Sequence, residues 1–419
     1  MSIFNTIKTL AFAGSLALSA NAAAQTQVKQ VIVANGGKFE FAAPFEDYVT
    51  VSAYNPATQQ SNTFATVYTQ SVIDLQIDNG TLFLAAQDSI VRYNLDTYAA
   101  TGKAYFNAVR KLKVADSKLL VGKFYGSGAF FHIYDKATLQ PLHSFSQIAN
   151  EVKDIAVIGD TAYVAHNKQN NNYNDSVGYI GVVKISTGQF IRNIDLGQRG
   201  AGISRLFVQG KKVIGVANRK KMLYHYNTVN AVISHDSIGV SNGIALINNT
   251  LYANFKRGIG SYDLSTQQIT DTVIVDTADI AAAAFDVVNN RFYITQTDFF
   301  SYIKGGIYNL AGEKIGVLPV GFSPEAIGID YRTTTSTAEN IARPLAIYPN
   351  PSAGNIWVQL PQNTENATLQ VHSITGQKTD NVQVTANTPV NLSHLPRGIY
   401  VLEMRDNSGF VYRSRFVKQ

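Results

Sequence analysis

Charged side chains recur at one position of a repeated four-residue pattern, and their types and spacing make them the best candidates for chemistry in this chain. In four successive copies the third residue of the pattern is charged: Asp74, Lys111, Asp154 and Arg205. In the other three copies the third residue is small: Gly243, Ala284 and Ala326. Alternating acids and bases would either neutralise one another as ion pairs or hold a ligand through charge-assisted hydrogen bonds. The small residues, with Glu325 just before Ala326, would leave room for that ligand.

A second set of candidates lies where the next strand of each copy ends. Most of these positions carry amide, basic or imidazole side chains: Asn35, Gln87, Lys123, His166, Asn218, Phe255 and Gln296. In a fold that arranges the copies around an axis, both sets meet on one face. We therefore predict a ligand-binding face formed by the four charged residues, Glu325 and the polar strand-end residues. A purely structural ring of ion pairs around a narrow channel is the alternative, and the two interpretations are compatible.

No catalytic residue is predicted. A general acid–base pair needs carboxylates or histidines about a water's width apart, and Asp74, Asp154, Glu325 and His166 could converge in that way. Basic neighbours would, however, keep the carboxylates ionised instead of raising their pKa. The absence of cysteine excludes disulfides, thiolate nucleophiles and Cys-ligated metals. The histidines lack metal-ligand spacing, so we expect no metal and no cofactor.

The elements that position these residues form a repeat of roughly 40 residues. Each copy has an apolar strand, a turn, a second apolar strand, a polar loop and a third strand containing Tyr or Ile. The seven openings are residues 72–75, 109–112, 152–155, 203–206, 241–244, 282–285 and 324–327. The last opening has no second strand after it, whereas residues 28–37 (VKQVIVANGG) form a second strand without a first. Pairing these two orphans would close a ring and remove exposed edges. We therefore predict an all-β chain with a seven-bladed β-propeller over residues 25–330, closed by its N- and C-terminal strands.

The repeat resembles the seven-bladed propellers of the YVTN/lactonase-like superfamily, and it is most similar to their YncE-like exported relatives from Bacteroidota. The segments that carry this resemblance are VIVANGG (31–37) and VSAYNPATQQ (51–60). Signatures of WD40 and sialidase propellers are absent, because residues 25–330 contain no Trp. The resemblance leaves a lactonase-like hydrolase as an alternative to a binding protein, and a structural surface component with no small ligand as another.

The N-terminus has the three parts of a signal peptide. Lys8 supplies the positive charge, residues 10–20 are apolar, and Ala22, Ala23 and Ala24 form a small-residue cleavage site. The apolar stretch is shorter than the roughly 20 residues that span a bilayer. We therefore expect residues 1–24 to be removed during export, and no transmembrane segment in the mature chain.

The C-terminus changes character after a Thr-rich stretch, residues 331–343, which we interpret as a linker. Residues 344–419 alternate apolar and polar side chains over four strands, which predicts a small β-sandwich. The motifs YPNPSAGN (348–355), SITGQK (373–378) and LPRGIYVLEM (395–404), with the ending RSRFVKQ (413–419), resemble the type A C-terminal sorting domain of the type IX (Por) secretion system. This resemblance implies contact with the type IX machinery, cleavage near the linker, and an extracellular or cell-surface location.

The net charge of +6 does not indicate a nucleic-acid-binding protein. The densest basic run of the propeller region is Arg219, Lys220 and Lys221, with two lysines nearby, whereas phosphate binding needs a concentrated patch. We therefore predict a monomeric binding protein, exported by the type IX system, that holds an unknown small ligand or a surface protein on one propeller face and does not bind nucleic acid.

Overall fold

The computed structural model describes residues 25–38, 40, 46–172, 174–255, 258–299, 303–334, 343–360, 366–373, 377–405 and 411–419. The expected signal peptide lies outside the described residues, as does most of the expected linker. The chain divides into two compact units, one of residues 26–332 and one that contains residues 333–419. Each unit is described by itself.

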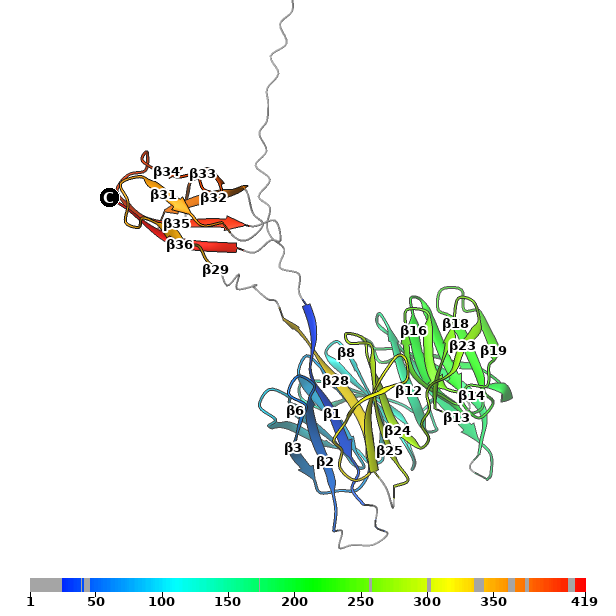
Figure 1. Cartoon of the computed structure of the whole chain (residues 1–419). Helices are drawn as coiled ribbons and strands as arrows, with labels where there is room; N and C mark the ends of the chain where they lie inside the picture. The colour runs from blue at the N-terminus through cyan, green and yellow to red at the C-terminus, as the bar shows by residue number, and fades with distance from the viewer. Residues whose placement is uncertain are drawn as a thin grey trace, which may run out of the picture. The chain divides into compact units, whose positions relative to one another are not determined.

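Residues 25–334 form seven four-stranded sheets arranged as the blades of a propeller (Figure 1). The first strands of the blades are β28 (Pro324–Thr334), β4 (Val72–Asp78), β8 (Val109–Ala115), β12 (Val152–Ile158), β16 (Ile203–Gln209), β20 (Asn242–Ile247) and β24 (Ile280–Asp286). The second strands are β1 (Gln25–Asn35), β5 (Thr81–Ala86), β9 (Lys118–Lys123), β13 (Thr161–Gln169), β17 (Lys212–Ala217), β21 (Thr250–Asn254) and β25 (Arg291–Thr297). Successive first strands from β4 to β24 contact one another, and they surround the central channel.

The outer half of each blade is formed by two further strands. The third strands are β2 (Val49–Asn55), β6 (Ser89–Asn94), β10 (Phe131–Asp135), β14 (Asp175–Lys184), β18 (Met222–Asn227), β22 (Ile259–Asp263) and β26 (Ile303–Asn309). The fourth strands are β3 (Gln60–Val67), β7 (Ala100–Tyr105), β11 (Pro141–Phe145), β15 (Gln189–Asp195), β19 (Ile233–Ser237), β23 (Gln268–Val275) and β27 (Lys314–Val317). A single 3-10 turn, η1 (Gln198–Gly200), precedes β16 among the described residues.

Burial falls from the second strand of a blade to the fourth. In β5, residues 82–86 are all buried, because neighbouring blades cover both faces of the sheet at this depth. In β7, by contrast, no residue is buried, as expected for an outer edge strand. Six of the seven hairpins between third and fourth strands have an Asx turn: Asn94, for example, accepts hydrogen bonds from the backbone N–H groups of Asp96 and Thr97. Hydrophobic clusters between adjacent blades form the core.

The ring closes with strands from both ends of the propeller unit. β28 pairs beside β1, so that one sheet has the order β28-β1-β2-β3, and the two strands lie side by side in Figure 1. Gly36 N donates to Ser323 O at 2.6 Å where the strands meet the channel face. The predicted all-β propeller with this closure is therefore confirmed. β28 also runs through Thr334, into the stretch that we expected to be linker, because Arg332 forms ion pairs with Asp330 and Asp96.

The C-terminal unit is built from two small sheets. The five-stranded sheet has the order β29 (Arg343–Pro344), β36 (Val411–Lys418), β35 (Gly398–Arg405), β32 (Asn366–Ser373) and β33 (Lys378–Thr385). The three-stranded sheet has the order β30 (Ile347–Tyr348), β31 (Asn355–Val358) and β34 (Val390–Asn391). One core cluster joins the two sheets, with Ile356, Leu369, Leu402 and Phe416 fully buried, as in a sandwich.

Candidate functional site

A β-bulge near the start of the first strand recurs around the ring. In β4, Val72 pairs with Ala86 and Asp74 with Ala85, so Ile73 is the extra residue. The same shift leaves an extra residue in four other first strands: Arg110, Lys153, Ser204 and Ala281. A bulge interrupts the strict alternation of side chains. As a result, the extra residue lies at the cavity on the channel face, while the next residue points into the channel.

The four charged residues predicted from the repeat come together in a ring. Lys111 Nζ lies 3.1 Å from Asp74 Oδ1 and 3.6 Å from Asp154 Oδ1. Each carboxylate also accepts a backbone N–H from another blade, Leu112 N at 2.9 Å for Asp74 and Leu206 N at 2.8 Å for Asp154. Both carboxylates are therefore engaged in joining blades, which supports the structural interpretation of this part of the ring.

Asp154 is the most deeply enclosed member of the ring. Burial raises the pKa of its carboxyl, but the charges of Lys111 and Arg205 and the N–H groups of Leu206 and Ile155 outweigh burial and lower the pKa below its usual value. Asp154 therefore stays ionised at neutral pH, which is unsuitable for a general acid.

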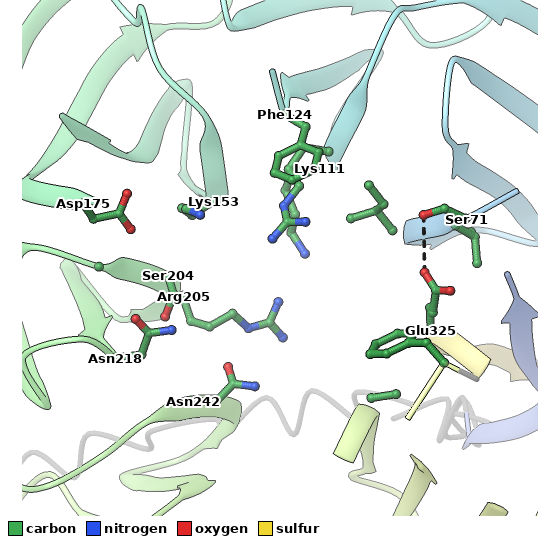
Figure 2. Close-up of a pocket in the computed structure, with 16 residues that line it drawn as sticks. Ser71, Lys111, Phe124, Lys153, Asp175, Ser204, Arg205, Asn218, Asn242 and Glu325 are labelled. Carbon is green, nitrogen blue, oxygen red and sulfur yellow. Dashed lines mark hydrogen bonds between the residues drawn. The ribbon is translucent and has the colours of Figure 1, made fainter. Parts of the chain in front are cut away.

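A cavity of about 580 Å³ opens on the channel face, and we call it the mouth cavity (Figure 2). Its lining includes the bulge residues and residues from the neighbouring loops: Ser71, Val72, Ile73, Arg110, Lys111, Phe124, Lys153, Asp175, Gly202, Ser204, Arg205, Asn218, Asn242, Ala281, Phe299 and Glu325. A second cavity of about 190 Å³ shares six of these residues and adds Asp74, Gly243 and Ala326. The two cavities therefore adjoin each other at the channel.

Three of the four cations that line the mouth cavity are neutralised by carboxylates that do not line it. Glu151 is buried in the loop before β12, where Arg110 Nε lies 3.1 Å from its Oε1 and Lys153 Nζ 2.5 Å from its Oε2. Arg110 also lies over the ring of Phe124, 4.8 Å from its centroid. Since Lys111 is held by Asp74 and Asp154, three of the four lining cations already have acidic partners.

Arg205 is the exception. Its Nε donates to Gly243 O at 3.1 Å, and among the described residues no carboxylate lies within ion-pair distance of the guanidinium. Figure 2 shows the side chain reaching from β16 toward the centre of the mouth cavity. The two terminal nitrogens of Arg205 are therefore presented to whatever occupies the cavity.

Glu325 lies across the ring from Arg205, on β28, and likewise has no cation within ion-pair distance among the described residues (Figure 2). Its carboxyl accepts hydrogen bonds from Ser323 Oγ at 2.7 Å and from Ser71 Oγ at 3.5 Å. Burial raises its pKa to about 7, against the lowering effect of these hydroxyl groups and of Val72 N–H. Gly36 provides the necessary space, because a Cβ there would lie 2.1 Å from Glu325 Oε1.

The remaining predicted residues have local structural partners. Asn35 is buried and links Thr50 to Gly321 N, and Gln87 accepts from Thr69 Oγ1 and from Gln70 N. Lys123 donates to Ser127 O at 2.7 Å, and Gln296 donates to Ala278 O at 2.6 Å. None of these four lines the mouth cavity, whereas Asn218 does.

His166 does not join the carboxylates as the sequence suggested it could. It is 3% exposed, its Nε2 donates to Asn193 Oδ1 at 3.0 Å, and its ring stacks on Tyr179. Burial lowers its pKa, so it is neutral at physiological pH. His166 lines neither of the two channel-face cavities and serves as a core residue of its blade.

The predicted register of two blades needs correction. In β24, Ala282 and not Ala284 pairs as Asp74 does, because the hairpin to β25 has four residues, 287–290, where the hairpin after β4 has two. In β20 the residue paired in the position of Asp74 is Asn242, because the bulge of this strand comes later, at Ile244. Gly243 and Ala326 do line the smaller cavity, as predicted. Phe255 is buried in a hydrophobic cluster.

The sequence interpretation also missed several lining residues. Arg110 and Lys153 adjoin predicted residues and would face away from the channel in a regular strand, so only the bulge brings them to the cavity. Phe124 and Phe299, 38% and 44% exposed, line the cavity from loops that follow second strands. Aromatic residues just after two second strands are visible in the sequence and could have indicated that these loops line a cavity.

The C-terminal unit is the part of the chain with a matching family model. Residues 346–419 match the secretion system C-terminal sorting domain. This unit is a type IX sorting domain. The tail indicates export by the type IX system, and hence a secreted or cell-surface protein that contacts the secretion machinery. A search of curated protein sequences found no match.

Solved structures resemble the chain at low identity. The computationally designed Ika8 protein is 15% identical with a TM-score of 0.48, over 70% of this chain and 90% of that one. The extracellular domain of the one-component system BT4673 from B. thetaiotaomicron is 12% identical with a TM-score of 0.48, over 92% and 57%. BamB from Moraxella catarrhalis is 10% identical with a TM-score of 0.45, over 80% and 95%. The activity must therefore be argued from the site.

The part of the chain that the structure describes lacks two features. No helix there is long and apolar enough to cross a membrane. No group of three or more His, Asp or Glu side chains there is arranged to hold a metal ion.

Proposed function

We propose that the propeller unit is a ligand-binding module, displayed on the cell surface or released, whose site is the mouth cavity. The observation that carries this proposal is Arg205, a cation without a carboxylate partner that points into a cavity of about 580 Å³. Small-molecule sites are concave, commonly 300–1,000 Å³, and have a few convergent polar groups beside apolar ones. Phe124 and Phe299 supply the apolar surface here.

The domain organisation belongs to the same proposal. Residues 1–24 act as a signal peptide, residues 25–330 form the binding module, and cleavage near the linker, residues 331–343, separates it from residues 344–419. The sevenfold sheet arrangement and the VIVANGG segment support a place for the module among the YVTN/lactonase-like propellers. We propose a monomer that takes a small ligand, and we propose no nucleic-acid partner.

A ligand screen by thermal shift on the mature chain tests the binding function. A ligand at about 100 times its dissociation constant adds about 2.7 kcal/mol of stability. Binding in the mouth cavity predicts that Arg205→Gln removes the shift, whereas Arg192→Gln on the outer strand β15 keeps it. A ligand whose shift survives Arg205→Gln would place the site elsewhere.

A lactonase-like hydrolase is the second candidate, and Glu325 is the observation that favours it. A carboxyl with a pKa of about 7 is poised to act as a general base near neutral pH. Asp74 and Asp154 do not serve in this role, because Lys111 and backbone N–H groups engage both. Hydrolysis predicts that Glu325→Gln abolishes turnover of lactone substrates while the variant still folds. Absence of turnover in the unmodified chain would reject this candidate.

A further inference from the structure

Two opposite charges, Arg205 and Glu325, line the mouth cavity, and among the described residues neither has an oppositely charged group within ion-pair distance; Arg205 acts on Asp154 only from farther away. Arg205 extends from β16, and Glu325 extends from β28, on the opposite side of the ring (Figure 2). The two do not form an ion pair with each other. The other acid of the lining, Asp175, is on β14, in the blade next to that of Arg205. Among the described residues that line the mouth cavity, Glu325 is therefore the only carboxyl on its side; Asp74 of the neighbouring blade lines the smaller cavity and is paired with Lys111.

The surroundings of the two groups suit opposite halves of one ligand. Arg205 has two terminal nitrogens available, the geometry that binds a carboxylate through paired hydrogen bonds. Glu325 accepts from Ser71 and Ser323 and retains acceptor capacity toward the cavity, where an ammonium group would supply the missing positive charge. An uncompensated buried carboxyl is costly, and a cation in the ligand would relieve that cost.

We propose that the mouth cavity binds a small zwitterion, with its carboxylate on Arg205 and its ammonium group on Glu325 and Ser71. This inference rests on the proposed binding function and specifies its ligand class. A free amino acid and a short peptide with unblocked termini share this chemistry, and the length of the best ligand distinguishes them. A ligand with only one of the two charges leaves either Arg205 or Glu325 unpaired.

The charge state of Glu325 gives the binding a pH dependence. Below pH 7 the carboxyl is mostly protonated, so an ammonium ligand must displace its proton. Affinity therefore falls as the pH drops from 8 to 6, and binding at pH 7 releases protons. The groups that hydrogen-bond to Glu325 are Ser71, Ser323 and the Val72 N–H, none of which titrates in this range. The charged residues that line the smaller cavity with it are Asp74, Lys111 and Arg205.

Titration calorimetry on residues 25–419, the chain without its signal peptide, tests the proposal with matched probes. Triglycine carries both charges, N-acetyltriglycine lacks the ammonium group, and triglycinamide lacks the carboxylate. Glycine, 4-aminobutanoate and 6-aminohexanoate test the amino-acid source over increasing length. The proposal predicts that at least one of these zwitterions binds and that its affinity is lower at pH 6 than at pH 8. If triglycine is that ligand, N-acetyltriglycine and triglycinamide should each bind at least tenfold more weakly.

Variants assign each charge to its residue. In Glu325→Gln, N-acetyltriglycine should bind as tightly as triglycine. In Arg205→Gln, triglycinamide should bind as tightly as triglycine. Arg205→Lys should recover part of the preference for triglycine over triglycinamide. Arg192→Gln should leave the preference for triglycine over both blocked probes unchanged. Equal binding of blocked and free probes by the unmodified chain, or no binding of any zwitterion, overturns the proposal. The broader binding function survives that result if the thermal-shift screen finds another ligand that depends on Arg205.

Discussion

At the scale of single residues, Glu325 makes stability depend on pH in a direction opposite to most carboxylates. Burial raises its folded pKa to about 7 from a usual value of 4.5. The folded chain therefore retains a proton that the unfolded chain has lost, so Glu325 reduces stability progressively as the pH rises from 4.5 to 7, and by a constant amount above. Glu325→Gln removes this effect, and its stability relative to the unmodified chain should rise by about 3 kcal/mol between pH 4.5 and 8.

Urea unfolding of both chains at several pH values measures this difference directly. Parallel stability profiles for the two chains would show that Glu325 ionises normally in the folded state. The same titration bears on the hydrolase alternative, because a general base with an ordinary pKa would no longer be poised near neutrality.

Asp154 tests the structural part of the charged ring. Asp154→Ala leaves Leu206 N without its acceptor and removes one of the two acids around Lys111, so we expect a loss of about 3 kcal/mol, typical of a broken buried ion pair. Asp78, whose pair with Lys136 is more exposed, provides the control, and Asp78→Ala should cost much less. Equal midpoints in urea for the two variants would mean that the ring does not hold the blades together.

At the scale of elements, the contact between β14 and η1 fixes the start of β16, the strand that carries Arg205. A Cβ on Gly178 of β14 would lie 2.0 Å from Gly200 O, a backbone atom that cannot turn aside. Gly178→Ala should therefore displace η1 and cost about 1–3 kcal/mol. A Cβ on Gly316 of the edge strand β27 would lie 3.3 Å from its nearest neighbour, the terminal Cδ1 of Ile307, so Gly316→Ala should stay within about 0.5 kcal/mol.

Thermal unfolding of both glycine variants gives the comparison. If Gly178→Ala melts like Gly316→Ala, the approach of η1 to β14 is not a close contact in solution. Where a ligand is known, weaker binding by Gly178→Ala alone would show that this contact also positions Arg205.

The same scale explains which features the sequence could predict. Asp74, Lys111, Asp154 and Arg205 were found as neighbours because an apolar strand pattern repeats, and the repeat fixes their common depth in the ring. Ala284 was placed wrongly because the hairpin at 287–290 is longer, and a hairpin's length sets the pairing register. Arg110 and Lys153 were missed because a bulge breaks the two-residue period that strand reasoning assumes. Glu151, which pairs with Arg110 and Lys153, lies in a loop, where no two-residue period applies.

At the scale of the whole molecule, the candidate site exists only if the ring is closed. Glu325 belongs to β28, which is joined to the propeller through β1, while Arg205 belongs to β16 on the other side of the channel. Their separation is set by the intervening blades on both sides. Opening the ring at β1 would release Glu325 from its partners near Gly36 and Ser71.

Deletion of residues 25–37 from the mature chain tests this closure. It removes Val31, Ile32 and Val33, all 0% exposed, and leaves β28 without a neighbour in its sheet. At roughly 1.5–3 kcal/mol for each buried aliphatic side chain, these three residues alone predict a loss of about 4.5–9 kcal/mol, a large part of the stability of a typical domain. Deletion of residues 345–419 removes a separate compact unit and should leave the melting temperature of the propeller nearly unchanged.

Calorimetry and gel filtration of the two truncated chains distinguish the outcomes. A synthetic peptide of residues 25–37 should restore a cooperative transition to the first chain, because it supplies the missing strand between β28 and β2. If the chain without residues 25–37 melts as the intact propeller does, β1 is dispensable and β28 must be held by other contacts. The position of Glu325 opposite Arg205 would then not depend on closure, and a ligand bound by both residues should be retained by the shortened chain.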